Sequence, residues 1–432
     1  MLPNHTKIDV QKVRYPVVKQ AFLSTNYIQT KDDVTALIVW HDGFIPKSTF
    51  LNILPHQRVS KIPGMDFLCF KSTTFKALNH MRALFPKTYN FFPITFLLPF
   101  QFAEFQKEHL KIAASTGIPV TWIFKPKSGC CGNGIKLIQN SFEVADSSFS
   151  GVIQKYVPPY LIDGFKFDFR IYIFIATIEP FTCYIYNDGV ARFCSQAYNA
   201  PTKDNLNDKF SHLTNTAINV GNSETSHEIL QLVSKVISKI KEMDPRGNVL
   251  WRRIKEVAAL VMLAQYNNII EQIKQQETEN RTKQRIPCSS PGPNVPFNKK
   301  FFHLIGIDIM LNENCEPIIL EMNDRPSMCV TFDIENTLKT KIVEDILKII
   351  TLDGSPPSPN AQFGGWEQIL PVVEPNSPFS KTVQNVLAKS IKNTNPTMPK
   401  RVYPRDVIIW KKRASSKSYR GSSILPPLHA NQ

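Results

Sequence analysis

The chain has 432 residues, 42% of them hydrophobic and 20% charged, which is long enough for two or three packed lobes and too apolar for a wholly disordered protein. Its net charge of +15 indicates either an acidic partner (nucleic acid, a membrane surface or an acidic protein tail) or a basic protein with no special partner. Its eight cysteines include no CxxC pair, its N-terminus lacks the apolar core of a signal peptide, and it has no run of about 18 apolar residues, so we expect a soluble cytoplasmic protein without a membrane span.

The N-terminal 100 residues mix strand and helix signals. Residues 35–44 have the β-branched and aromatic content of a buried strand, and residues 71–86 carry apolar side chains on one helical stripe. An apolar run between prolines follows at 91–99, and then a predicted helix around 100–115. We therefore expect an N-terminal α/β lobe over residues 1–105.

The middle of the chain predicts a sheet. Short apolar segments typical of strands lie at residues 121–126, 135–139, 151–157, 165–178 and 182–187. Helices before and after these strands indicate an α+β fold with a largely antiparallel sheet.

The C-terminal half begins with helices. Residues 224–243 and 248–275 have apolar residues at three- and four-residue spacing, and the polar, proline-rich stretch 276–298 predicts a loop. Residues 301–311 and 316–323 then predict a β-hairpin.

A last amphipathic helix is expected at 335–350, and the composition of the chain changes directly after it. From residue 351 onward Pro, Ser, Asn and Gly dominate, with 11 Lys and Arg residues against 4 Asp and Glu. This composition predicts a flexible basic tail.

The first candidate site is a glycine-rich loop. A predicted strand ends at Lys125, and the sequence SGCCGNG follows at 128–134. Gly129, Gly132 and Gly134 allow a tight turn whose N–H groups could cover phosphates, with Lys125 as a neighbouring cation. The alternative is a simple hairpin turn. The loop is not a Walker A motif, because no Gly-Lys-Ser/Thr follows, and it is not a Rossmann fingerprint.

The second candidate is a charged strand face. Strand alternation places Lys166, Asp168 and Arg170 on one face of an otherwise apolar strand. Charges there are costly unless they pair with one another or border a site. One interpretation is a salt-bridge ladder. The other is a phosphate lysine, a ribose or structural aspartate, and an arginine facing developing charge.

The third candidate lies on the predicted hairpin. Glu321 and Asn323 are two residues apart and point to the same side, and Asp308 on the other arm can face them. Two carboxylates and an amide oxygen are hard ligands suited to Mg²⁺, so this set predicts a magnesium site.

The fourth candidate is the segment His212, Leu213, Thr214 and Asn215, which follows Arg192. Such residues in a loop before a helix usually serve as caps, so a capping role and a binding role both remain open.

Taken in order, these motifs resemble the tubulin tyrosine ligase-like family of ATP-grasp amino-acid ligases, over roughly residues 10–350. The resemblance is carried by WHDGF, HQRVSKIPGM, FFPITFLLP, WIFKP with GNGI, IQKYVPPYLIDGFKFDFRIYIF, IYNDGVARF, HLTNTAIN, IGIDIML and ILEMNDRPS. The N-terminal segments look closest to the branch that adds glutamate chains to tubulin tails.

The resemblance implies an ATP-grasp fold. The N-terminal lobe would be followed by a central subdomain at 106–185 and a C-terminal subdomain with the Mg²⁺ site at 186–352. Residues 353–432 would be the flexible basic tail.

The resemblance also implies roles for individual residues. Lys125 and Lys166 would hold ATP phosphates under a loop with Gly132 and Gly134, and Lys71 would reach the nucleotide from the N-terminal lobe. Arg170 and Arg192 would lie near the γ-phosphate and the incoming amino acid, with Lys166 also in the catalytic set. The strand that recognises adenine in the family matches Gln154, Lys155 and Val157, with Asp168 nearby. The family's Mg²⁺ ligands match Asp308, Glu321 and Asn323. The loop that lines the family's pocket matches His212, Leu213, Thr214 and Asn215.

The implied activity is ATP- and Mg²⁺-dependent ligation of free glutamate to glutamate side chains of tubulin tails. The implied protein is a monomer acting on microtubules in the cytoplasm, with a cilium, flagellum axoneme or basal body as possible sites. Alternatives are a glycylase or other amino-acid ligase, or a catalytically weakened microtubule-binding protein. A nucleic-acid binder fits the charge, but no RNP, KH or zinc pattern occurs.

Two positions depart from the family pattern. Cys131 stands where the family usually has Arg or Lys, and Val220 where it usually has Lys. Each change removes a positive charge near an anionic site, which favours weakened activity or a donor other than glutamate.

Overall fold

The computed structural model describes residues 4–127, 132–220, 222, 228–281, 292–358 and 361–392. The chain divides into two compact units, 1–389 and 390–432. The first unit holds three sheets and is described below. Gly129, Cys130 and Cys131 lie outside the described residues, as does nearly all of the second unit.

The N-terminal sheet is parallel. Its strands run in the order β2 (Ile28–Thr30), β1 (Lys7–Lys12), β3 (Ile38–His41) and β4 (Arg58–Val59). The helices of this region are α1 (Pro16–Leu23), α2 (Lys47–Leu51), α3 (Met65–Leu68) and α4 (Lys71–Leu84). Parallel strands need crossover connections, which explains the mixed strand and helix signals of this region.

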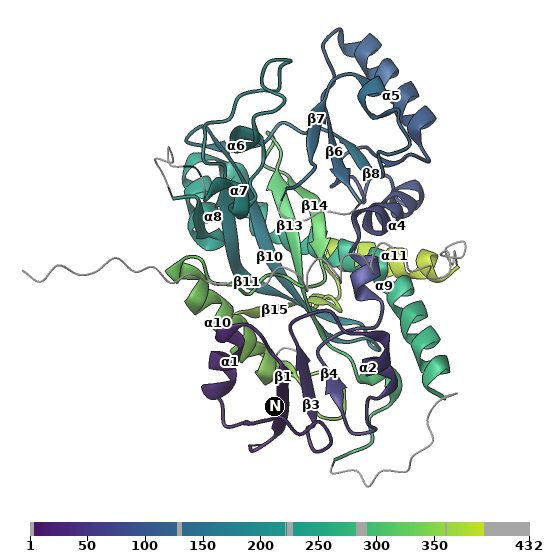
Figure 1. Cartoon of the computed structure of the whole chain (residues 1–432), viewed down its shortest axis with the longest axis vertical. Coiled ribbons are helices and arrows are strands. Elements are labelled where there is room, and N and C mark those ends of the chain that lie inside the picture. Colours follow the sequence, from purple (N-terminus) through teal and green to yellow (C-terminus); the bar gives the residue numbers. More distant parts are fainter. Residues whose placement is uncertain are drawn as a thin grey trace, which may run out of the picture. The chain divides into compact units, whose positions relative to one another are not determined.

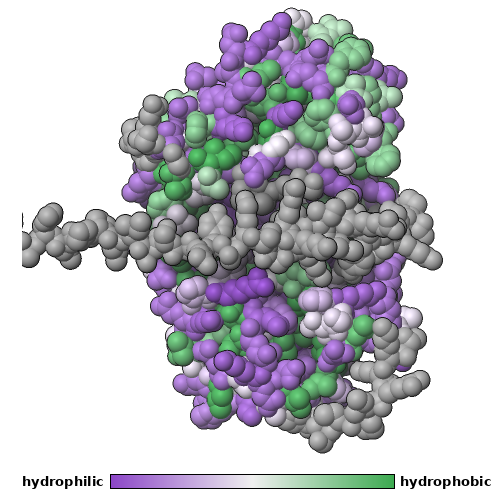
Figure 2. Space-filling view, viewed as in Figure 1, coloured by the Kyte–Doolittle hydropathy of each residue, from purple (hydrophilic) through white to green (hydrophobic). Residues whose placement is uncertain are grey.

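A small antiparallel sheet follows. Its order is β5 (Thr95–Leu98), β8 (Gly151–Lys155), β6 (Trp122–Pro126) and β7 (Lys136–Ile138), with helix α5 (Phe102–Thr116) and the 3₁₀ helix η1 (Ser141–Val144) beside it (Figure 1). Its core is built from aromatic and β-branched residues, including Phe105, Trp122 and Ile153. Figure 2 shows hydrophobic residues among hydrophilic ones over this part of the surface. Phe142 of η1 is one exposed hydrophobic residue of this region, at 68%.

The central sheet is antiparallel throughout. Its order is β12 (Leu230–Leu232), β11 (Thr182–Phe193), β10 (Phe165–Thr177), β13 (His303–Leu311) and β14 (Pro317–Asn323), while β9 (Leu161–Ile162) pairs with β10 and β15 (Trp366–Leu370) with β11. The predicted α+β class and the predicted hairpin are confirmed.

Helices cover both faces of the central sheet (Figure 1). Tyr172 and Phe174 pack in one core with residues of α1 and α10 (Asp333–Ile349), and α9 (Leu250–Arg281) contacts β11, β14 and β15. A strand that is covered on both faces reads as a continuous apolar run, which is the pattern of residues 171–176. The remaining elements are α6 (Lys209–His212), α7 (Thr216–Asn219), α8 (Val233–Met243), η2 (Pro245–Val249), η3 (Phe297–Lys299) and α11 (Pro378–Lys392).

The structure corrects two boundaries. The predicted loop at 276–298 is helical up to Arg281, where an i, i+4 ion pair joins Arg281 to Glu277 at 2.8 Å. The predicted helix at 224–243 begins only at Val233, because Leu230–Leu232 pairs with β11.

The predicted flexible tail from residue 353 is wrong for β15. This strand extends the central sheet, and Trp366 is only 4% exposed because it packs on Phe174 and Tyr186. The proline- and serine-rich composition around it concealed a short core strand. Across the described residues, no helix is long and apolar enough to cross a membrane.

Candidate active site

Two adjoining cavities lie between the small sheet and the central sheet. We call them the narrow cavity, lined among others by Lys125, Gln154 and Lys166, and the wide cavity, of about 760 Å³, lined among others by Arg170 and Asn323. Arg192, Asn215 and Glu321 line both.

Nearly every predicted site residue lines one of these cavities. The narrow cavity is bordered by Lys125, Gln154, Lys155, Val157, Lys166, Asp168, Arg192, His212, Thr214, Asn215, Asp308 and Glu321. The wide cavity is bordered by Lys71, Gly132, Arg170, Arg192, Asn215, Glu321 and Asn323. Gly134 lines neither. Its φ of 75° and its lack of room for a side chain, since an added Cβ would lie 3.1 Å from Pro126 Cγ, assign it to the turn itself.

Two buried lysines face the narrow cavity without a carboxylate partner among the described residues. Lys125 Nζ donates only to the Leu320 carbonyl oxygen, at 3.4 Å, and Lys166 Nζ donates to the Tyr156 hydroxyl at 3.1 Å and to the His212 carbonyl oxygen at 2.8 Å. Burial lowers the pKa of Lys125 to about 8, against the opposing effect of Glu321, and also lowers the pKa of Lys166. Two buried ammonium groups without counter-ions favour an anionic ligand.

An ion-pair ladder crosses the central sheet beside these lysines. Asp168 lies opposite Arg192, and Arg170 opposite Asp308, in the strand register. Arg192 binds Asp168 through two hydrogen bonds of 2.7 and 2.6 Å and reaches Asp308 at 2.8 Å, while Arg170 binds both oxygens of Asp308 at 2.5 and 3.0 Å.

The electrostatics of the ladder follow from this pairing. Burial alone would raise the pKa of Asp308, but Arg170 and Arg192 outweigh it and hold that pKa well below its usual range. Lys166 stays outside the ladder. The two interpretations of the charged strand are therefore compatible, because Asp168 and Arg170 form ion pairs whereas Lys166 faces the cavity unpaired.

The predicted magnesium ligands lie together at the end of the hairpin. Asp308 pairs with Glu321 in the strand register, and Asn323 Nδ2 donates a hydrogen bond to Glu321 Oε1 at 3.4 Å. Lys71, from helix α4, forms an ion pair with Glu321 at 3.0 Å. The described residues hold no group of three His, Cys, Asp or Glu suited to a metal, so the donor set depends on the amide oxygen of Asn323. Two carboxylates and an amide oxygen are the hard ligands that suit Mg²⁺.

The inner end of the narrow cavity offers an unused acceptor. Gln154 is fully buried in β8, its Nε2 donates to Thr95 Oγ1 at 2.9 Å, and its Oε1 has no hydrogen-bond partner among the residues that the structure describes. A buried amide oxygen beside a cavity is suited to a ligand with an N–H donor, such as an adenine amine.

The glycine loop and the 212–215 segment meet across the cavities. Gly132 has a φ of 79°, and an added Cβ would lie 2.6 Å from Ile218 and 3.0 Å from Asn215 Oδ1. Asn215 precedes α7 but makes no side-chain capping hydrogen bond, whereas Asp208 caps α6. The capping role considered for this segment is thus wrong for Asn215. Val220 lines the wide cavity and is 50% exposed.

Some residues of the wide cavity were not found from sequence. Lys339 Nζ binds Glu335 at 2.5 Å inside helix α10, and both side chains are buried at the cavity wall. A Glu–Lys pair at i, i+4 is also common on exposed helix faces, so the sequence offers no signal that assigns this pair to a cavity. Arg325, Ser327 and Cys329 line the same wall, in the segment after β14.

Comparison with known proteins identifies the family. The model of the tubulin-tyrosine ligase family matches residues 51–359. The chain belongs to this family. Among similar members, a probable beta-tubulin polyglutamylase of Tetrahymena thermophila is 29% identical over 79% of this chain and 28% of its own length. Tubulin polyglutamylase TTLL6 of Homo sapiens is 28% identical over 80% of this chain and 37% of its own length.

A third member of the family, tubulin polyglutamylase TTLL11 of Mus musculus, is 31% identical over 72% of this chain. The chain spans only 28%, 37% and 42% of the lengths of these three relatives. Every residue that lines either cavity lies within the matched residues 51–359, so the family match covers the whole site.

Proposed function

We propose that the protein is an ATP- and Mg²⁺-dependent ligase that joins glutamate to glutamate side chains of tubulin C-terminal tails. The observation that carries this proposal is a pair of buried lysines, Lys125 and Lys166, that lack a carboxylate partner in the described part of the chain and lie next to an arginine–carboxylate ladder at the wide cavity. The names of the similar family members support tubulin as the substrate and glutamate as the donor.

The nucleotide would lie in the narrow cavity. Gln154 Oε1 would accept from the adenine amine, and Lys125 and Lys166 would bind the phosphates. Lys155, Val157, His212 and Thr214 would form the walls around the base and sugar, as their positions in the cavity lining allow.

The acceptor and donor would meet in the wide cavity. An acceptor carboxylate attacks the γ-phosphate of ATP, which gives an acyl phosphate and ADP. The α-amine of free glutamate then attacks the acyl carbon, so that an amide bond forms and phosphate leaves. The first step brings two anions together, and Arg170 and Arg192 at the cavity border would reduce their repulsion. Asp308, Glu321 and Asn323 would hold Mg²⁺, which supplies further charge neutralisation at the phosphates.

The decisive experiment is a ligation assay. Purified protein is incubated with ATP, Mg²⁺, tubulin and labelled glutamate, and intact tubulin is weighed by mass spectrometry beside the Glu321→Gln variant. We expect mass increments of one or more glutamates with the wild type and at least a hundredfold fewer with Glu321→Gln. Lys107→Met, on the exposed face of α5, is the matched control and should behave as wild type. ATP binding without any ligation of glutamate, glycine or tyrosine would contradict the proposal.

A second candidate is a catalytically weakened microtubule-binding member of the family. The observation in its favour is Val220, which presents an uncharged side chain to the wide cavity where the family usually has Lys. Val220→Lys separates the two candidates, because it would raise the ligation rate of a weakened enzyme at least tenfold.

A further inference from the structure

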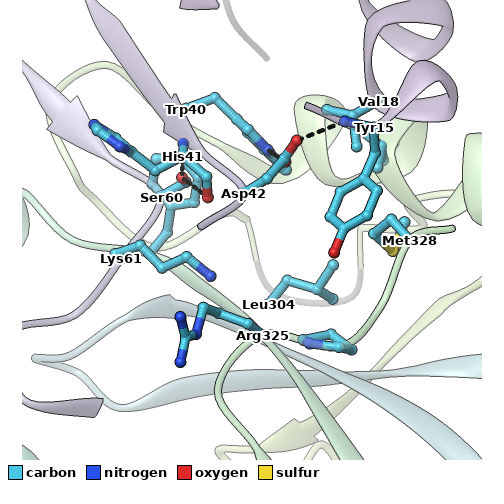
Figure 3. Close-up of a pocket in the computed structure, with 13 residues that line it drawn as sticks. Tyr15, Val18, Trp40, His41, Asp42, Ser60, Lys61, Leu304, Arg325 and Met328 are labelled. Atoms are coloured by element: carbon cyan, nitrogen blue, oxygen red, sulfur yellow. Dashed lines mark hydrogen bonds between the residues drawn. The ribbon is translucent and has the colours of Figure 1, made fainter. Parts of the chain in front are cut away.

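A third, small cavity lies behind the wall of the wide cavity. It is lined by residues at the carboxyl ends of two parallel strands, namely His41 at the end of β3, Asp42 directly after it and Lys61 after β4, and by the segment that follows β14 (Figure 3). Ligands of α/β sheets often bind at such strand ends. We call it the side pocket. Arg325 lines both the side pocket and the wide cavity, so the two meet at this residue.

The wall between the two cavities is one extended segment. Pro326 and Met328 face the side pocket, whereas Ser327 and Cys329 face the wide cavity. The segment begins two residues after Asn323, at the end of the hairpin that carries the predicted metal ligands. A molecule that reacts in the wide cavity therefore has the side pocket as its neighbour.

Lys61 is the main charge of the side pocket. Lys61 is only 9% exposed, and its Nζ donates to the Asp324 carbonyl oxygen at 3.2 Å. Among the described residues, no carboxylate lies within ion-pair distance of this Nζ. Burial lowers the pKa of Lys61 to about 8, against the opposing effect of Asp324, so the side chain is still mainly protonated at neutral pH. An ammonium group has three donors, and within the described part of the chain one of them is used.

The carboxylates near Lys61 already accept hydrogen bonds from other groups. Asp42 accepts hydrogen bonds from the backbone N–H groups of Arg14 and Tyr15 at 2.6 and 3.0 Å, and from Trp40 Nε1 at 3.1 Å. The Asp324 carboxylate accepts from Arg325 Nε at 2.8 Å.

The lining of the side pocket holds two basic side chains, Lys61 and Arg325, against one carboxylate, Asp42, which leaves an excess of one positive charge. Burial lowers the pKa of His41 to about 4, so its ring is neutral at pH 7. Figure 3 shows the Lys61 amino group and the Tyr15 hydroxyl directed toward the space between them, whereas the Arg325 side chain lies below Lys61 with its guanidinium directed away from Tyr15. The side pocket thus offers donors and positive charge to a small anion.

The size of the side pocket limits what can enter. Its cavity volume is about 30 Å³, against about 760 Å³ for the wide cavity. Since one water needs roughly 10–15 Å³ measured in this way, the side pocket holds a group of about two or three heavy atoms. A carboxylate fits, whereas a whole amino acid does not.

We propose that the side pocket binds a side-chain carboxylate of the acidic acceptor chain, next to the residue that reacts in the wide cavity. This inference rests on the proposed function for the identity of the acceptor. A chain of glutamates carries a carboxylate on every residue, and neighbouring residues are spaced by about 3.3–3.6 Å when extended, so one can react while another is held. A free glutamate consumed in the wide cavity needs no second pocket.

The test measures binding separately from catalysis. A fluorescein-labelled peptide of consecutive glutamates is titrated with the full chain, and its anisotropy gives Kd for the wild type, Lys61→Met and Arg325→Gln. We expect Lys61→Met to raise the peptide Kd about tenfold, because one charge-assisted contact is lost, and Arg325→Gln to raise it in the same direction. Lys19→Met, on the exposed side of α1, is the matched control and should leave Kd unchanged.

Where ligation is measurable, Lys61→Met should raise KM for the peptide and leave KM for free glutamate and for ATP unchanged. An increase in KM for glutamate alone would overturn the acceptor assignment, and so would an unchanged peptide Kd in Lys61→Met. If Lys61→Met does not fold, an unchanged Kd in the partly exposed Arg325→Gln overturns it instead. Peptide binding needs no turnover, so a protein that binds the peptide through Lys61 without ligating glutamate would contradict only the proposed activity.

Discussion

Lys125 illustrates how the burial of a single charged residue points to the candidate active site. A buried ammonium group with one weak acceptor destabilises the folded chain, because desolvation is not offset by a counter-ion. Lys166 is buried in the same cavity, with a hydroxyl and a carbonyl oxygen as partners. The ion-paired residues Asp168 and Arg170 do not carry this cost to the same degree. Buried cations without a carboxylate partner among the described residues, more than charge in general, are therefore the feature on which the proposed binding role rests.

Replacing Lys125 by Met should change ligand affinity and stability in opposite directions. Lys125→Met should raise Kd for ATP about 10- to 100-fold, since a charge-assisted contact to phosphate contributes roughly 1.5–3 kcal/mol. At pH 7 the free energy of unfolding should increase by about 1–3 kcal/mol, because the variant no longer buries a charge. Titration with a fluorescent ATP analogue and urea denaturation measure the two effects.

The pH dependence of this stability difference has a defined sign. The pKa of Lys125 is about 8 in the folded chain and 10.5 for an unperturbed lysine, so between these values the unfolded state binds more protons. Wild-type stability then rises with pH through this group, and the advantage of Lys125→Met should shrink between pH 7 and pH 10. Lys107→Met should show neither effect. A variant that is less stable at pH 7 and binds ATP normally would show that Lys125 is structural.

At the scale of elements, strand register assembles the site. Asp168, Arg170 and Arg192 become neighbours only because β10 pairs with β11 on one side and β13 on the other. Strand alternation along the sequence predicts which face each residue takes, but it does not predict the partner strand. The same argument applies to β15, whose five residues join the sheet from beyond the last predicted helix.

Trp366 should therefore contribute strongly to stability. It is buried on Phe174 and Tyr186, and its Nε1 donates to the Ile342 carbonyl oxygen at 3.3 Å. Trp366→Ala should lower the free energy of unfolding by about 3–5 kcal/mol, through lost burial and a cavity. Val373→Ala, at a side chain that is 46% exposed, should change it by less than about 0.5 kcal/mol. Equal melting temperatures for both variants would show that β15 does not stabilise the fold, as expected for the flexible tail that its composition predicted.

At the scale of the whole molecule, the cavities are built by segments far apart in the chain. Lys71 from the N-terminal region reaches Glu321 in the hairpin, and Arg58, fully buried, donates to carbonyl oxygens of Ala176, Lys299 and Thr351. These contacts fix the parallel N-terminal sheet against the central one. The net charge of +15 also belongs to this scale, because it acts on an acidic partner over distances of about a Debye length.

Residues 393–432 should strengthen binding to microtubules through charge alone. This segment carries eight Lys and Arg residues and one acidic residue. Truncation after Lys392 should weaken co-sedimentation with microtubules at low salt at least tenfold and reduce its salt dependence. A full-length variant with the eight basic residues changed to Gln should match the truncation. Co-sedimentation that is unaffected by either change would show that the charge of this segment takes no part in binding.

The sequence by itself determined most strands of the small and central sheets, the hairpin of β13 and β14, the motif residues of both cavities and, through the order of its motifs, the family. These follow from local rules, since alternation, helical spacing and turn residues act over a few positions. Only the tertiary structure decided which charges pair, that Asn215 borders the cavities instead of capping a helix, that β15 belongs to the central sheet, and that Lys61 and Arg325 share a side pocket. Those facts depend on how segments distant in sequence pair and pack. The burial of apolar surface over the whole chain selects that register and packing, and no local sequence pattern encodes them.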